Sequence, residues 1–183
     1  MYVCKCLAFV KPLLHSRSME NISSPATMDR TTKIRTGVLL VILFGVCLLL
    51  AFQKALYPMI GLFAFNIVLC TFVRGHLPDR YILEDGNLVI DAPLKKIYVP
   101  LRSITQIRWI EPEDKRGLYR QWASGGLFGD WGYFSSATIP TMKVYARRTN
   151  QWILITTYDC GRFVISPDDP DFFYYLNRAA KGR

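Results

Sequence analysis

The sequence predicts a membrane-anchored protein: a two-helix transmembrane hairpin, then an all-β barrel or sandwich capped by a C-terminal α-helix. Three observations lead to this fold class. Residues 37–73 contain one charged side chain, Lys54, although 20% of the 183 residues are charged. Short β-prone runs separated by turn residues follow this segment. The chain then ends in a stretch with helical apolar spacing.

Charge and composition exclude several classes of protein. The 51% apolar content excludes a disordered chain. The formal net charge of +9 comes from modest basic excesses on either side of the uncharged segment, without the basic stripe that is typical of nucleic-acid binding. Five scattered cysteines do not suit a disulfide scaffold, and two histidines, His15 and His76, give little support to imidazole catalysis.

The uncharged segment predicts a hairpin at 34–73, with membrane-spanning helices at about 34–52 and 55–73. Each helix is about 28 Å long at roughly 1.5 Å per residue, close to the thickness of the hydrocarbon core of a bilayer. The alternative is a buried hairpin in a soluble core. It is disfavoured because neither segment has the polar face of a soluble helix.

Basic residues flank the hairpin at both outer ends: Arg30, Lys33, Arg35, Arg74 and Arg80. The positive-inside rule therefore predicts a multi-pass protein of the cell (inner or plasma) membrane with both termini in the cytoplasm. Lys54, in the turn, is a contrary charge. Within the helices, Gly45, Gly61 and Asn66 are expected to hold the hairpin together, or alternatively to mediate oligomerisation through it.

Residues 1–33 are expected to form a disordered cytoplasmic N-terminal tail. Lys5 and Lys11 interrupt its apolar runs, which argues against a signal peptide. Met19 and Met28 are alternative start residues, and a start at Met28 would leave a compact basic anchor before the first helix.

The remaining residues, 79–183, predict an all-β domain with a final helix. Runs at 81–84 and 88–90 flank Asp85-Gly86, which is a strong β-hairpin pattern. Further strands are expected at 96–99, 104–110, 141–146, 152–155 and 162–165. Turn residues recur about every 8–12 positions, as in a sandwich or small barrel.

The final helix should pack on an open end of the β domain, because Phe172, Leu176 and Ala179 fall on one of its faces. Two starts of this helix are open. One is a capping box that begins at Ser166, and the other is Asp169 as the cap before Pro170.

Five segments in order resemble the bacterial pleckstrin-homology-like (PH-like) domain family, over about residues 79–180. They are SGGLFG at 124–129, GYF at 132–134, KVYA at 143–146, ILITT at 153–157, and ISPDDP at 165–170 with Phe172 after it. Membrane-anchored members carry a two-helix hairpin before the domain, as this chain does. The resemblance implies a seven-stranded, strongly bent antiparallel barrel or sandwich that a C-terminal helix closes at one end.

The resemblance implies little about activity. Eukaryotic relatives of the fold often bind phosphoinositides through basic residues of the first hairpin, whereas residues 83–87 (LEDGN) are acidic here. This departure from the pattern disfavours a phosphoinositide site.

The sequence assigns no catalytic, cofactor-binding or metal-binding residue. The stretch 125–132 lacks the Gly-Lys-Ser/Thr of a phosphate-binding loop, so its glycines are expected in turns, bulges or close strand contacts. The acidic run 166–171 lacks calcium-loop spacing, and Cys160 has only Arg162 as an electropositive neighbour. Aromatic residues near the glycines are expected in the core or, alternatively, on an exposed rim: Trp122, Phe128, Trp131, Tyr133 and Phe134.

The sequence therefore predicts a non-catalytic integral membrane protein that displays a PH-like interaction domain at the cytoplasmic membrane surface. Its expected partners are the lipid bilayer and a protein or peptide, with no nucleic acid and no cofactor. The alternative function is recognition of anionic lipid headgroups. It requires a set of basic residues to converge on one membrane-facing patch: Lys95, Lys96, Arg102, Arg108, Lys115, Arg116, Arg120, Arg147 and Arg148.

Overall fold

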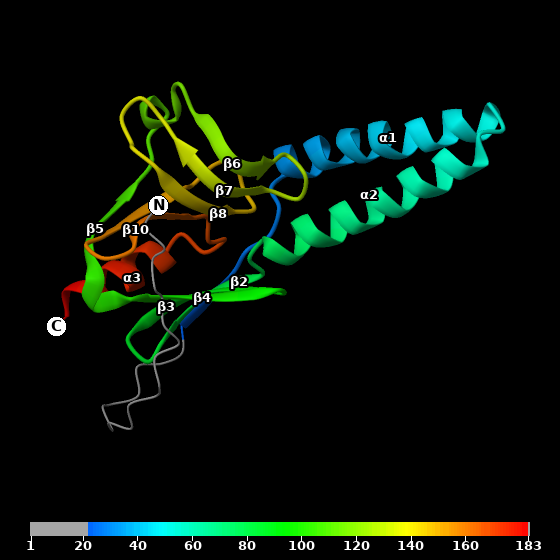
Figure 1. Cartoon of the computed structure of the whole chain (residues 1–183). Helices are drawn as coiled ribbons and strands as arrows, with labels where there is room; N and C mark the ends of the chain where they lie inside the picture. Colours follow the sequence, from blue (N-terminus) through cyan, green and yellow to red (C-terminus); the bar gives the residue numbers. More distant parts are fainter. Residues whose placement is uncertain (1–21, 183) are drawn as a thin grey trace.

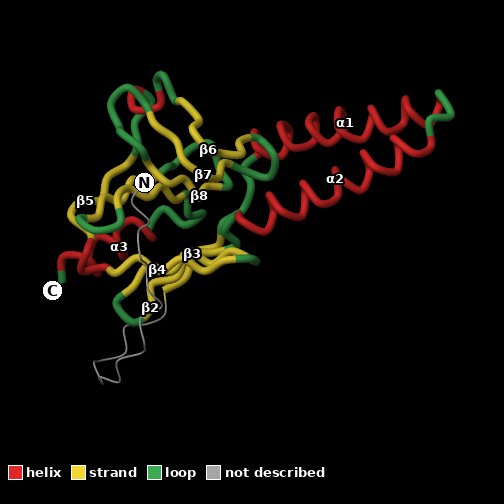
Figure 2. Tube along the Cα trace, viewed as in Figure 1, coloured by secondary structure: helices red, strands yellow, loops and turns green. Residues whose placement is uncertain are grey.

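Two long helices project side by side from a β-rich body (Figure 1). The computed structural model describes residues 22–182. The body contains two sheets and a short C-terminal helix, α3 (Phe172–Lys181), and Figure 2 shows its strands in two layers next to the helical hairpin. Two long helices, a β-rich domain and a C-terminal helix are therefore present in the predicted order.

The first sheet has the strand order β1-β2-β3-β4: β1 (Ile22–Pro25), β2 (Arg80–Glu84), β3 (Asn87–Ala92) and β4 (Lys95–Pro100). The second has the order β5-β9-β10-β8-β7-β6: β5 (Ile104–Trp109), β6 (Tyr119–Gly125), β7 (Asp130–Ser135), β8 (Met142–Ala146), β9 (Ile153–Thr157) and β10 (Gly161–Ile165). Two short 3-10 turns, η1 (Leu101–Ser103) and η2 (Glu113–Lys115), flank β5.

The hairpin consists of α1 (Arg30–Phe52) and α2 (Leu56–His76). α1 begins at Arg30 rather than at 34, because the Asp29 carboxylate caps it by accepting a hydrogen bond from the Thr32 amide at 2.8 Å. Lys54 turns the chain between the helices with a φ of 59°.

Asn66 joins the two helices, as the sequence predicts. Its side-chain amide donates to the Leu43 carbonyl oxygen at 3.1 Å and to Cys47 Sγ at 3.6 Å. The same expectation is wrong for Gly45 and Gly61. A Cβ on either glycine would meet no atom within 4 Å, so neither makes a close helix contact.

The structure differs from the expected disordered tail over residues 22–33, because β1 and the start of α1 lie there. β1 pairs antiparallel with β2, with Ile22 opposite Leu83. The helical hairpin is thus an insertion between two paired strands of one sheet. The features noted at Lys5, Lys11 and Met19 lie outside the described residues.

The predicted hairpin at Asp85-Gly86 is confirmed. It joins β2 to β3, and both turn residues have positive φ values, 46° and 74°, as a type I′ turn requires. The sequence does not predict β6 and β7, which form a second hairpin across the glycine-rich stretch. Gly132 (φ 120°) permits the close strand contact there, since a Cβ would collide with the Trp122 carbonyl oxygen.

The second sheet is mixed, whereas the resemblance implies an antiparallel one. β10 lies between β9 and β8, so it runs antiparallel to β9 and parallel to β8. The described strands also number more than the seven that the resemblance implies, because β1, β6 and β7 extend the sheets.

The main core lies between the two sheets and α3. Tyr81 of β2 is fully buried in it, and its hydroxyl donates to the Tyr145 carbonyl oxygen at 2.7 Å and accepts from the Ser166 amide at 3.1 Å. Burial raises the pKa of Tyr81 to about 12. A second core covers the other face of the six-stranded sheet and includes Phe134 and Trp152.

α3 closes this main core. Phe172 and Leu176 are fully buried, and Ala179 packs against the same cluster, which confirms the predicted apolar face. The capping box at Ser166 is wrong, because its hydroxyl accepts from the backbone amides of two arginines in the β8–β9 loop. Asp169 is not the N-cap either: α3 begins after Asp171, whose side chain makes no capping hydrogen bond, and the Asp169 carboxylate accepts from the Asp171 amide at 2.9 Å in the turn before the helix.

Candidate functional site: the junction of hairpin and domain

The β6–β7 turn rests against the base of the hairpin. Leu127 is buried in an apolar cluster with Val73 of α2. Thr36 of α1 fixes the turn on the other side: its hydroxyl donates to the Gly126 carbonyl oxygen at 3.1 Å and accepts from the Phe128 amide at 2.9 Å. The glycine-rich turn therefore contacts both helices.

Asp79 joins the end of α2 to the β8–β9 loop. It pairs with Arg74 at 2.6 Å and with Arg147 at 3.3 Å. Arg147 also donates to the Ala26 carbonyl oxygen at 3.2 Å, directly after β1. Asp79 and Arg147 thus connect the segments before α1 and after α2 to the second sheet.

Asp29 provides a further link between hairpin and domain. Besides capping α1, its carboxylate accepts from the Thr149 amide at 3.1 Å and hydroxyl at 2.7 Å. Burial, the largest single influence, raises the pKa of Asp29, but the hydrogen bonds from Thr32 and Thr149 together lower it to about 2.

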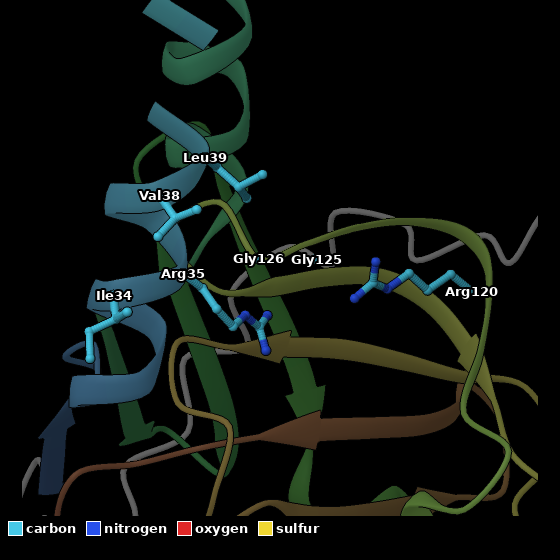
Figure 3. Close-up of a pocket in the computed structure, with 7 residues that line it drawn as sticks. All are labelled: Ile34, Arg35, Val38, Leu39, Arg120, Gly125 and Gly126. Carbon is cyan, nitrogen blue, oxygen red and sulfur yellow. The ribbon is translucent and has the colours of Figure 1, made fainter. Parts of the chain in front are cut away.

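A cavity of about 340 Å³, which we call the junction cavity, lies between α1 and the β6–β7 hairpin. In Figure 3, the guanidinium groups of Arg35 and Arg120 point toward each other across Gly125 and Gly126. Arg35 Nη2 lies 3.4 Å from the buried carboxylate of Asp130. Burial raises the pKa of Asp130, and the two arginines oppose that shift.

A second cavity, of about 170 Å³, opens between β4 and the β7–β8 face of the other sheet. We call it the aromatic cleft, and its lining residues are His76, Ala92, Lys95, Ile97, Trp131, Tyr133 and Tyr145. Trp122 pairs with Tyr133 across β6 and β7 and is 85% exposed beside the cleft. The His76 and Trp131 rings lie 4.4 Å apart at its hairpin end.

The aromatic residues near the glycine-rich stretch are expected either in the core or on an exposed rim, and each expectation holds for some of them. Phe134 is fully buried in the second core, whereas Trp122 and Tyr133 are exposed. Phe128 and Trp131 are half-buried against the base of the hairpin.

The nine basic residues named for lipid recognition do not share one role. Five have partners within the domain: Lys96 with Asp91, Arg108 with Asp114, Lys115 with the Thr149 carbonyl, Arg147 with Asp79, and Arg148 with Asp168. Of the remaining four, Arg120 faces the junction cavity and Lys95 lines the aromatic cleft. The acidic β2–β3 turn lies apart from both cavities.

The residues considered for catalysis or metal binding, Cys160 and the acidic run at 166–171, make contacts within the fold. Cys160 packs against the main core, and its amide donates to the Thr157 hydroxyl. Asp168 of the acidic run accepts from the Thr27 amide and pairs with Arg148. Within residues 22–182, no group of three or more His, Cys, Asp or Glu side chains is placed to hold a metal ion.

The fold and the junction define a class: a β-rich domain, closed by a C-terminal helix, on two helices long and apolar enough to cross a membrane. The family model described as "Bacterial PH domain" matches residues 79–179, more than half of the chain. The chain therefore belongs to the bacterial PH domain family. No curated protein and no solved structure matched in the other two comparisons.

Sequence reasoning missed both cavities. Arg35 and Asp130 are 95 residues apart in the chain, and the strand pairing of β6 with β7 brings Arg120 to them. The excess of glycine and aromatic residues near 125–132 marks the region, but it does not reveal which basic residues meet there.

Proposed function

We propose that this chain is a non-catalytic integral membrane protein whose PH-like domain binds a protein partner at the cytoplasmic surface of the cell membrane. The observation that carries the proposal is the exposed apolar surface of the two helices that are joined to the domain. In each helix, only 11% of the most apolar 18-residue window is buried, so both helices expose apolar side chains around most of their circumference. Such a surface requires a bilayer or an equally apolar cover.

The orientation of the domain toward the bilayer is part of the proposal. The hairpin leaves from the adjacent strands β1 and β2, and the ion pairs of Asp79 and the hydrogen bonds of Thr36 brace its base. A hairpin so braced would hold the domain against the headgroups in one fixed orientation. The basic flanks of the helices favour the cytoplasmic side.

The aromatic cleft is the proposed surface for the partner. Exposed aromatic side chains are enriched at protein interfaces. Trp122 and Tyr133 lie opposite each other on β6 and β7, and both are exposed beside the cleft. Within residues 22–182, neither Lys95 nor Lys143 lies within 4.0 Å of a carboxylate, and Lys143 Nζ lies 5.9 Å from the centre of the Tyr133 ring. The partner segment would therefore carry carboxylates next to apolar side chains.

The mode of recognition follows from the edge strand. β6 is the outer strand of its sheet, but a register shift between Arg120 and Trp122 interrupts its ladder. Such bulges hinder the addition of another strand. Recognition would therefore depend on side chains of the cleft rather than on main-chain pairing.

Membrane insertion is tested by extraction of native membranes with alkaline carbonate. The full chain should remain in the membrane pellet, because two apolar spans cannot leave the bilayer with the salt-sensitive surface proteins. Recovery in the soluble fraction would contradict insertion.

Partner binding is tested by site-specific photocrosslinking in the same membranes. A photoreactive phenylalanine analogue at Trp122 should give a discrete crosslinked product, and Lys95→Glu should abolish it by reversing the charge of the cleft. The matched control is the analogue at Tyr158, which is 65% exposed in the β9–β10 turn. Equal products at both positions would contradict a specific surface at the cleft.

A further inference from the structure

The arginines at the junction cavity have an arrangement that the proposed partner surface does not use. Arg35 comes from α1 and Arg120 from β6, and both line the same cavity of about 340 Å³ (Figure 3). Asp130 is the carboxylate between them, 3.4 Å from Arg35 Nη2. Two guanidinium groups against one carboxylate leave one positive charge, and Arg120 has no carboxylate within 4.0 Å among residues 22–182.

The backbone of the β6–β7 hairpin makes room for these groups. A Cβ on Gly125 would lie 2.7 Å from both Arg120 Nη2 and Asp130 Oδ1. Glycine at this position therefore lets the arginine lie over the strand with its guanidinium beside the cavity. The site is built from both parts of the chain, and neither the helix nor the domain holds it alone.

Apolar side chains of α1 line the cavity beside the arginines, and they include Ile34 next to Arg35. Val38 and Leu39 line it from α1, and both are exposed. Val38 and Leu39 lie about 4.5 and 6 Å further along the helix axis than Arg35, at roughly 1.5 Å per residue. Guanidinium groups followed within one helical turn by apolar side chains match the change from phosphate to acyl chain in a phospholipid.

We propose that this cavity binds the phosphoryl group of an anionic membrane phospholipid, with Arg35 and Arg120 as donors and Val38 and Leu39 against the first part of an acyl chain. Guanidinium groups donate paired hydrogen bonds that suit phosphate oxygens. The inference rests on the insertion of the hairpin, but not on the protein partner or the aromatic cleft. It also differs from headgroup binding at the first hairpin, which is acidic here.

The test uses the full chain, purified in an uncharged detergent and examined by native mass spectrometry. Phosphatidylglycerol, phosphatidylcholine and inorganic phosphate are added in separate arms. The parent chain should retain one phosphatidylglycerol molecule in preference to phosphatidylcholine, and inorganic phosphate should not displace it. The double variant Arg35→Gln/Arg120→Gln should bind roughly 25-fold more weakly, since each arginine near an anionic lipid contributes roughly fivefold.

The control is Arg102→Gln/Arg116→Gln, which removes the same charge from exposed positions outside the cavity. It should retain the lipid as the parent does. Because Arg35 also pairs with Asp130, Arg120→Gln alone serves as the variant that leaves every ion pair of the described residues intact. Arg120→Gln should bind phosphatidylglycerol roughly fivefold more weakly than the parent chain. Its near-ultraviolet circular dichroism spectrum should be unchanged, which would show that the fold is intact.

Equal lipid retention by the parent chain and both cavity variants would overturn the site. Displacement of the lipid by inorganic phosphate, or binding of phosphate alone, would overturn the lipid as the source of the phosphoryl group. Failure of insertion appears separately, in the carbonate extraction, so that the two hypotheses fail by different measurements.

Discussion

Asp29 shows how a single side chain stabilises two parts of the molecule. It caps α1 through the Thr32 amide and holds the β8–β9 loop through Thr149. Replacing Asp29 by alanine removes both interactions. The loss of an N-cap alone costs about 0.5–2 kcal/mol, so Asp29→Ala should lower the free energy of unfolding by about 2 kcal/mol at neutral pH. Thermal unfolding of the full chain in detergent measures this change.

The pH dependence of that difference follows from the lowered pKa of Asp29. Its value in the folded chain is about 2, below the ordinary 3.8, so the stabilisation is complete above about pH 3.8. It is lost as the pH falls through about 2. Parent and Asp29→Ala should therefore differ in unfolding midpoint at pH 5 and converge near pH 2. A difference that persists unchanged at pH 2 would show that ionisation of Asp29 is not involved.

Asp29→Asn separates the two roles of the side chain. Asparagine is as good an N-cap as aspartate, but its amide nitrogen cannot accept the hydrogen bonds from Thr149. This variant should fall between the parent chain and Asp29→Ala in stability. An unfolding midpoint equal to that of the parent would mean that the contact with Thr149 adds nothing.

At the scale of the element, α3 closes the main core through a narrow apolar face. Phe172 is fully buried there. Truncation of a buried phenylalanine costs about 3–5 kcal/mol, so Phe172→Ala should lower the unfolding midpoint of the full chain sharply. Tyr174→Ala is the matched control on the same helix, because Tyr174 is 61% exposed, and it should change stability by less than about 0.5 kcal/mol. Similar midpoints for both variants would mean that α3 is only loosely docked.

β1 contributes to the fold more than its four residues suggest. It supplies the outer strand next to β2, and Ala26, directly after it, is buried in the main core. A chain that begins at Met28 loses this pairing and exposes the edge of β2. Each net hydrogen bond contributes about 1 kcal/mol, so this chain should unfold at a clearly lower temperature than one that begins at Asn21. Equal midpoints for the two truncated chains would contradict a structural role of β1.

The elements show which features of a fold a sequence can reveal. The face of α3 and the Asp85-Gly86 turn follow from local spacing and turn chemistry, and both are predicted. β1 is not, because its sequence (ISSP) has little apolar character and its partner strand follows only after the hairpin. The junction cavity is not predicted either, because Arg35 and Asp130, which meet beside it, are 95 residues apart in the chain. Long-range pairing, rather than local propensity, decides these features.

At the scale of the whole molecule, the insertion of the hairpin between β1 and β2 fixes the orientation of the hairpin relative to the domain. Both strands that lead into the helices belong to one sheet, and Arg147 holds the residue after β1 and Asp79 before β2 at once. The hairpin therefore cannot tilt without disturbing the sheet. A domain tethered through a single flexible linker would lack this constraint.

The proposed topology makes a prediction about the two ends of the molecule. Gln53 is exposed in the turn between α1 and α2, and Tyr158 is exposed at the other extreme, in the β9–β10 turn. With the domain in the cytoplasm, a membrane-impermeant maleimide added to intact cells should label Gln53→Cys above the level of the parent chain. Tyr158→Cys should react only after the membrane is opened. The basic flanks of the hairpin, Arg30 to Arg35 and Arg74 to Arg80, are the physical reason, because positively charged segments stay on the cytoplasmic side. Labelling of Tyr158→Cys in intact cells, with protection of Gln53→Cys, would reverse the orientation and place the aromatic cleft and its partner outside the cell.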